Sequence, residues 1–250
     1  MVWHSKAMCY TFLQQVELAI SCFETANKIQ PRERTFIELG NLFKREGQPE
    51  EALNVILDGL DAFPQSPELL TFAGLLQLQL DNSTEAFLHL GNALTYDPRN
   101  PTAILGAGSI IQTNSDHDVA LTKYRVAMAQ TPHCAELWNN VGLCFLGKGK
   151  FVGAAASLKR AAYLSPFDAR ICYNLGLCHL HLEQPASAFH YFSAGINLYA
   201  QKNEKGQTPG AAAGSPGAAG TGSSSAEALC YAFMAVALGK LEDYENSFAA

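Results

Sequence analysis

One stretch of this chain has residue types that could bind a nucleotide phosphate. The run from Gly142 to Gly149, GLCFLGKG, matches a phosphate-binding loop except at its last residue. Glycine stands there in place of the serine or threonine whose hydroxyl would hold a magnesium ion. The four residues between Gly142 and Gly147 are apolar and fit a helix, whereas a phosphate cradle needs an open loop after a strand. We therefore expect no nucleotide site here.

A second group of residues suggests a metal site. Cys178, His179, His181 and His190 lie close together in the sequence. On a helix, residues 179 and 181 point about 200° apart, so these two histidines cannot bind one ion. No nucleophile with a neighbouring base stands out either. The sequence predicts a protein that is not an enzyme, with no metal and no cofactor.

Two asparagines occupy equivalent positions in the sequence. Asn140 and Asn174 each precede a glycine by two residues. Amide side chains both donate and accept hydrogen bonds, so such a pair could bind the backbone of an extended peptide. Local structural hydrogen bonds are the alternative interpretation.

The same part of an acidic chain is locally basic. Its basic residues are Lys148, Lys150, Lys159, Arg160 and Arg170. An acidic partner surface or anionic lipid headgroups would suit them, and a solvated helix face is the alternative. With Asn140, Asn174 and Tyr173 they form the predicted partner-binding residues. The net charge of −6 and the pI near 5.6 argue against a nucleic-acid partner.

The elements that must position these side chains repeat at a fixed interval, from Gly40 to Gly74 and onward in equal steps. Glycine recurs at this interval, alanine follows it by twelve residues, and proline closes each unit. The residues are Gly40, Gly74, Gly108, Gly142, Gly176, Ala52, Ala86, Ala120, Ala154, Ala188, Pro64, Pro98, Pro132 and Pro166. The interval is that of a tetratricopeptide array, in which each repeat is two antiparallel helices. We predict an all-α solenoid, a right-handed superhelix of antiparallel helix pairs.

The glycine inside each first helix needs a physical reason, because glycine in a helix costs about 0.5–1 kcal/mol relative to alanine. We expect the two helix backbones of a repeat to approach too closely there for a side chain. In the unit from Ala135 to Asp168, Trp138 and Phe145 would fill the space on either side of Gly142. Proline cannot extend a helix, so Pro166 would end that unit.

Composition divides the chain into three parts. Residues 1–200 should form about six tetratricopeptide repeats. Residues 201–225 are rich in Gly, Ala, Ser and Pro, which predicts a disordered insertion. Residues 226–250 should start a further, truncated repeat, so we expect the chain to be the middle of a longer array.

Two further features bear on the compartment. The most apolar stretch, residues 228–239, is shorter than the roughly 20 residues needed to cross a bilayer. Of seven cysteines, Cys144, Cys172, Cys178 and Cys230 lie in apolar helical patterns. We expect buried free thiols in a reducing, cytoplasmic compartment.

Longer stretches of the sequence carry a more specific resemblance. They are AFLHLGNALTYDP (86–98), DVALTKYRVA (118–127), LWNNVGLCFLGKGKFVGAAASLKRAAYLSPFD (137–168) and YNLGLCHLHLEQPASAFHYFSAGIN (173–197). These stretches resemble the family of the fourth Bardet–Biedl syndrome protein. The resemblance includes residues expected on the surface, which stacking does not dictate: Thr95, Lys123, Tyr124, Lys159 and Arg160.

The resemblance implies a non-catalytic subunit of the BBSome, the coat-like complex that moves membrane proteins into and out of cilia. Its partners would be other BBSome subunits, with centriolar-satellite and motor-associated proteins as further candidates. It would lie at the cilium, basal body, centrosome and centriolar satellites, with at most peripheral membrane association. The insertion at 201–225 departs from the family pattern, which passes straight to the next repeat.

Two alternatives from other classes remain open. Asn140 and Asn174 would suit a substrate-binding array similar to that of the sugar transferase acting on Ser and Thr. A co-chaperone would use Lys and Arg to clamp an acidic peptide tail. Leu229 and Phe233 stand where those cations are expected, which argues against the co-chaperone.

Overall fold

The computed structural model describes residues 2–206 and 221–248, and within these ranges every regular element is an α-helix. The helices are α1 (Val2–Phe12), α2 (Val16–Ile29), α3 (Glu33–Arg45), α4 (Pro49–Ala62), α5 (Pro67–Gln79), α6 (Ser83–Tyr96), α7 (Pro101–Thr113), α8 (His117–Gln130), α9 (Ala135–Gly147), α10 (Phe151–Leu164), α11 (Ala169–His181), α12 (Pro185–Gly206) and α13 (Thr221–Phe248). The prediction of an all-α fold is confirmed.

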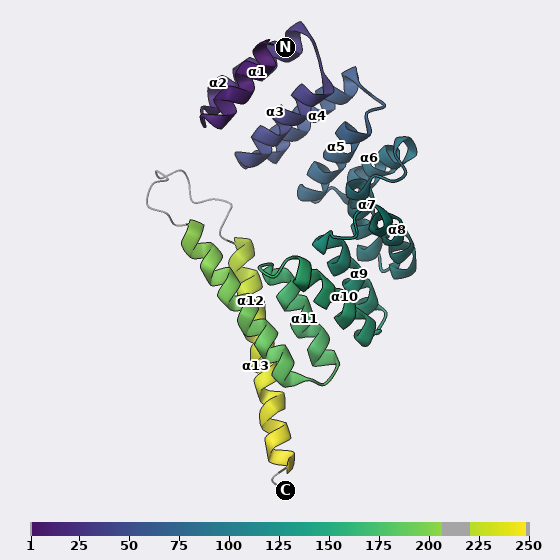
Figure 1. Cartoon of the computed structure of the whole chain (residues 1–250), viewed down its shortest axis with the longest axis vertical. Coiled ribbons are helices and arrows are strands. Elements are labelled where there is room, and N and C mark those ends of the chain that lie inside the picture. Colours follow the sequence, from purple (N-terminus) through teal and green to yellow (C-terminus); the bar gives the residue numbers. More distant parts are fainter. Residues whose placement is uncertain (1, 207–220, 249–250) are drawn as a thin grey trace. The chain divides into compact units, whose positions relative to one another are not determined.

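The helices pack as consecutive antiparallel pairs in two units (Figure 1). In the unit Met1–Gln130 the pairs are α1 with α2, α3 with α4, α5 with α6 and α7 with α8. In the unit Thr131–Ala250, α9 pairs with α10, α11 pairs with α12, and α13 packs against α12. Each pair corresponds to one predicted repeat.

Each repeat is bounded by residues that start or stop a helix. Ser66, Asn100 and Asp168 accept hydrogen bonds from backbone N–H groups in the first turns of α5, α7 and α11. Such caps satisfy amides that have no partner within the helix. The four recurring prolines lie in the turns after α4, α6, α8 and α10, as predicted.

The turn inside each repeat has a backbone feature that the sequence analysis did not find. One residue of this turn is left-handed in five successive repeats, with φ between 57° and 75°: Gly47, Asp81, Ser115, Gly149 and Glu183. These residues recur at the same interval as the glycines of the first helices. In the turn after α9, Lys150 N–H donates to Phe145 O at 2.9 Å and Gly149 N–H donates to Leu146 O at 2.9 Å. The left-handed residue reverses the chain between the two helices.

The recurring glycines make room for one large side chain each. A Cβ on Gly142 would lie 2.6 Å from Leu158 Cγ, and one on Gly176 would lie 2.5 Å from Phe192 Cε1. The filling residue always comes sixteen positions after the glycine and is fully buried: Ile56, Leu90, Tyr124, Leu158 and Phe192. We expected the two backbones themselves to exclude a side chain. The nearest atoms instead belong to these side chains, with Ala86 O near Gly74 at 3.2 Å as the closest backbone contact.

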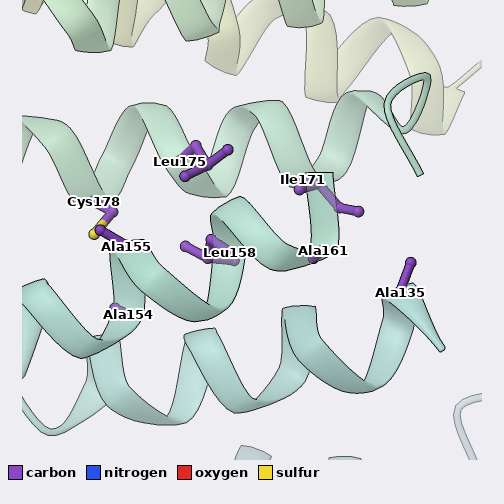
Figure 2. Close-up of a cluster of buried hydrophobic side chains, with 8 residues drawn as sticks. All are labelled: Ala135, Ala154, Ala155, Leu158, Ala161, Ile171, Leu175 and Cys178. Atoms are coloured by element: carbon purple, nitrogen blue, oxygen red, sulfur yellow. The ribbon is translucent and has the colours of Figure 1, made fainter. Parts of the chain in front are cut away.

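The recurring alanines lie at the centre of the core. All five are fully buried, as is Ala19 at the equivalent place in the first repeat. Figure 2 shows one such cluster, in which Ala154 and Leu158 of α10 pack with Leu175 and Cys178 of α11. A continuous apolar core therefore joins neighbouring repeats within a unit. Tyr124, expected on the surface, is fully buried because it fills the space at Gly108.

The end of the chain differs in detail from the predicted boundaries. Helix α12 runs to Gly206 and α13 begins at Thr221, so both helices include part of the 201–225 segment. Residues 207–220 lie outside the described part of the chain, and the disordered insertion stays a prediction. Helix α13 is continuous through the region predicted to start a further repeat. No glycine or proline follows Gly239 to end it.

The glycine contact predicts opposite effects for one substitution at two sites. Gly142→Ala should lower the free energy of unfolding by about 1–3 kcal/mol, because the added methyl overpacks the space that Leu158 fills. Gly91→Ala in α6 is the matched control, since a Cβ there meets nothing within 4 Å. It should raise stability by about 0.5–1 kcal/mol through helix propensity. Urea denaturation followed by circular dichroism measures both, and equal effects would contradict the contact.

Candidate functional site

The near-match to a phosphate loop is part of a helix. Residues 142–147 form the last part of α9, and Lys148 caps its C-terminal end. Gly149 is the left-handed turn residue before α10. These backbone amides therefore bond within the helix and its cap rather than to a phosphate. The prediction that residues 142–147 are helical is confirmed.

The predicted asparagine pair joins a third asparagine that the sequence analysis missed. Asn174 on α11 is buried, and its Nδ2 donates to Oδ1 of Asn139 on α9 at 2.8 Å. Asn139 Nδ2 lies 3.4 Å from Asn140 Oδ1. Asn174 therefore contacts Asn139 instead of its equivalent residue Asn140. The double asparagine at 139–140 was the only sequence signal.

The basic residues lie at three separate places, of which Arg170 at the start of α11 is one. Lys148 and Lys150 flank Gly149 in the α9–α10 turn. Lys159 and Arg160 lie on the exposed face of α10, about 13 Å further along that helix at 1.5 Å per residue. Arg160 also lies over the Tyr163 ring, 5.8 Å from its centroid. Of these four residues, the two on α10 lie within a helix and the other two lie in a turn.

Arg170 is held by a carboxylate of its own helix end. Its Nε and Nη2 donate to Asp168 Oδ1 and Oδ2 at 3.1 and 2.8 Å. This bidentate pair holds the pKa of Asp168 below its ordinary value, through the side-chain hydrogen bond first. Asp168 also accepts the N–H of Arg170 at 2.9 Å as the cap of α11. Both partners thus stabilise the start of α11.

Tyr173 belongs to an aromatic cluster. Its ring centroid lies 5.9 Å from those of Phe192 and Phe233, and the last two rings stack on each other. Burial raises the pKa of the Tyr173 phenol. The cluster joins α11, α12 and α13, so Tyr173 contributes to packing. Its predicted role in partner binding stays a prediction, as do those of the asparagines and basic residues.

The histidines and cysteines of this region point to different neighbours. Cys178 Sγ donates to Phe151 O at 3.2 Å, and the His181 ring stacks on Phe151. His179 pairs with Gln184 through Nδ1 at 2.8 Å and stacks on Tyr191. No three His, Cys, Asp or Glu residues in the described part of the chain group closely enough to hold a metal ion.

The cysteine thiols predicted to be buried are buried, and none of these four forms a disulfide. Burial raises the pKa of the Cys144 thiol to about 11 and also raises the pKa of Cys172 and Cys178. A thiol with a pKa near 11 is almost wholly protonated at neutral pH, and the thiolate is the nucleophile. Cys144, Cys172 and Cys178 are therefore poor nucleophiles that contribute to packing.

Comparison with protein families finds the tetratricopeptide repeat. A family model with this description matches residues 37–104 and 105–169, and a second matches residues 2–33 and 169–202. Among described helices, none combines the length and apolar character that a bilayer crossing requires. The matched residues fall in helices α1 to α12 and the turns between them.

Several characterised proteins are similar along nearly the whole chain. The BBSome complex member BBS4 of Bos taurus is 42% identical over 98% of this chain, and that of Mus musculus is 44% identical over 98%. The Drosophila melanogaster homolog is 32% identical over 95%. This chain covers 43%, 42% and 44% of these proteins, less than half of their length. The resemblance found from the sequence is confirmed.

Solved structures share the fold at lower identity. The APC/C hetero-tetramer Cut9–Hcn1 matches with a TM-score of 0.69 at 20% identity, over 78% of this chain and 39% of that one. The type IV pilus biogenesis factor PilW matches with a TM-score of 0.67 at 19% identity, over 81% of this chain and 93% of that one. These likenesses support the solenoid fold alone.

The buried hydrogen bond between Asn174 and Asn139 predicts that substitutions of the two residues affect stability jointly. Asn174→Ala should lower the free energy of unfolding by about 1–2 kcal/mol, because the half-buried Asn139 loses its partner. Asn54→Ala on the exposed face of α4 is the matched control for helix propensity. A double-mutant cycle with Asn139→Ala should give a coupling energy of about 0.5–1.5 kcal/mol. Additive effects would show that the contact contributes nothing.

The Asp168–Arg170 pair predicts a pH-dependent contribution. Because the pKa of Asp168 is lowered on folding, its stabilisation is present above about pH 4, the unfolded carboxyl's range, and is lost as the pH falls through the folded value. Asp168→Ala should cost about 1 kcal/mol at pH 7 through the lost cap. Asp168→Asn keeps an acceptor without the charge, so it should cost less.

The same pair of proteins compared at two pH values provides the control for this prediction. The stability difference between wild type and Asp168→Asn, measured by urea denaturation, should shrink between pH 7 and pH 3. A difference that stays constant over this range would contradict the charged pair.

Proposed function

The chain belongs to the tetratricopeptide-repeat family, and from this premise we propose that it is a non-catalytic scaffold that binds other proteins as a subunit of a BBSome complex. The observation that carries the proposal is the identity of 42–44% with BBSome complex member BBS4 of two mammals over 98% of the chain. Ciliary membrane-protein trafficking and cilium assembly are the processes it would serve.

The level of identity exceeds what the fold requires. Structures with TM-scores of 0.67–0.69 to this chain are only 19–20% identical to it, so the solenoid can form with about that much shared sequence. Identity of about twice that level over 98% of the chain is more than a shared fold needs, which supports a shared assembly.

The mechanism would be shape and surface chemistry. Stacked helix pairs hold their outer side chains in a fixed pattern along the array, and partners dock without covalent steps. Other BBSome subunits would be the principal partners, with centriolar-satellite and motor-associated proteins as further ones. The cilium, basal body and centriolar satellites would be its sites. Because this chain spans less than half of the BBS4 proteins, it would supply only some of the complex's contacts.

The two alternative functions gain no support from the geometry. A peptide-binding asparagine ladder needs free amides, but the Asn174 amide donates to Asn139. A carboxylate clamp needs cations near Phe233, and that ring instead packs on Tyr173 and Phe192. The scaffold in a BBSome complex is therefore the function that we propose.

Affinity purification tests this proposal. The tagged chain is expressed in ciliated cells, and co-purifying proteins are identified by mass spectrometry. A tagged tetratricopeptide chain of similar length from an unrelated protein serves as the control for non-specific binding. BBSome subunits should be enriched with this chain and not with the control. Recovery of the folded chain without any BBSome subunit would refute the proposed function.

A further inference from the structure

The outer face of α10 combines exposed apolar side chains with two adjacent cations. Val152 and Tyr163 are 76% and 77% exposed, and Lys159 and Arg160 are exposed beside them. At 3.6 residues per turn these four positions fall within about 100° of arc on the helix. We call them the α10 stripe. Phe167, 83% exposed, lies in the turn just beyond the end of the helix.

The neighbouring repeats supply a comparison for this stripe. At the equivalent positions of the preceding repeat, α8 has Asp118, Arg125, Val126 and Ala129, and at those of the following repeat, α12 has Ala186, Ser193, Ala194 and Asn197. Stacking therefore does not require a large apolar residue at 152 or 163, or two cations at 159 and 160. Large apolar side chains this exposed cost hydration free energy unless something covers them.

The charge around the stripe indicates the chemistry of the partner that would cover it. Residues 137–167 include four Lys or Arg residues and no Asp or Glu, in a chain whose net charge is −6. The Arg160 guanidinium lies 5.8 Å from the Tyr163 ring centroid, which places the cation beside the apolar surface. A partner with carboxylates next to aliphatic side chains complements both properties.

The shape of the stripe favours a helical partner. A helix exposes no unpaired backbone in its middle turns, so an extended peptide finds no backbone hydrogen bonds along α10. Two helices instead pack ridge into groove through their side chains. From Val152 to Tyr163 the stripe is about 16 Å long, the length of about three helical turns. An anionic membrane is an extended surface that would also meet acidic parts of the chain, whereas a single helix meets the stripe alone, so the helix is favoured.

We propose that the α10 stripe is a docking site for an acidic amphipathic helix of a partner protein. This inference rests on the proposed scaffold function and adds to it the place and the chemistry of one contact. Val152 and Tyr163 pack against the apolar face of the partner helix. Lys159 and Arg160 pair with carboxylates along the edge of that face.

A peptide titration tests the docking site on the full chain. The probe is a fluorescein-labelled peptide of five helical turns, with leucine at every third or fourth position and glutamate beside each leucine. A second peptide has the same composition in shuffled order. Binding is followed by fluorescence anisotropy at physiological salt and at higher salt. The chain should bind the amphipathic peptide, and it should bind the shuffled peptide at least about 10-fold more weakly. The affinity for the amphipathic peptide should fall as the salt concentration rises.

Two variants and a matched control locate the binding. Lys159→Glu with Arg160→Glu, and separately Val152→Ser with Tyr163→Ser, should each weaken the peptide by about 10-fold or more. Lys123→Glu with Arg125→Glu makes the same charge change on the exposed face of α8 and should leave affinity within about 2-fold. Circular dichroism of each variant confirms the fold, which these exposed positions should not alter.

Several outcomes would overturn the docking site. They are no binding of the amphipathic peptide by the wild-type chain, equal binding of the shuffled peptide, or equal losses in the α8 control. Binding to phosphatidylserine vesicles that the stripe variants abolish would assign the face to membrane instead. No BBSome subunit is present in the titration, so its failure leaves the purification result standing, and failure of the purification leaves the peptide result standing.

Discussion

The structure depends on one repeated contact: in five successive repeats, a glycine of the first helix leaves room for a large side chain sixteen residues later. At Gly142 the space belongs to Leu158, and at Gly108 it belongs to Tyr124. A fully buried alanine on the second helix lets the two helices of the repeat pack closely along the rest of their contact. This contact fixes the rotation of each second helix about its own axis. It therefore also fixes which residues of that helix face outward.

Fixing the inner face leaves the outer face free to vary between repeats. The core positions of α8, α10 and α12 are alike because each helix has the same contact with a glycine and the same buried alanine. Their outer positions differ in both charge and size. Stability thus resides in the repeated positions, which leaves the unrepeated ones free to differ in chemistry. This separation lets a regular solenoid present a different outer surface at each repeat.

The regular period of the sequence was enough to predict the helix pairs, the buried alanines and the proline-bounded turns, because each recurs with the same residue type. The left-handed turn residues were missed because Asp81, Ser115 and Glu183 share no residue type with Gly47. The partner of Asn174 was missed because this hydrogen bond joins residues 35 apart, a separation that the repeat interval does not predict. Arg170 was expected to be available to a partner protein. Its side chain instead pairs with Asp168 two residues earlier, a local ion pair that composition does not reveal.

The most direct test of the repeated contact is hydrogen exchange of the intact chain, resolved by proteolysis and mass spectrometry. Amides near each glycine and its filling residue should be among the slowest to exchange, because opening there breaks the tightest packing of the repeat. Amides at the helix ends and in the turns should exchange faster. Exchange around Gly142 and Leu158 as fast as in the turns would show that the contact does not hold the helix pairs together.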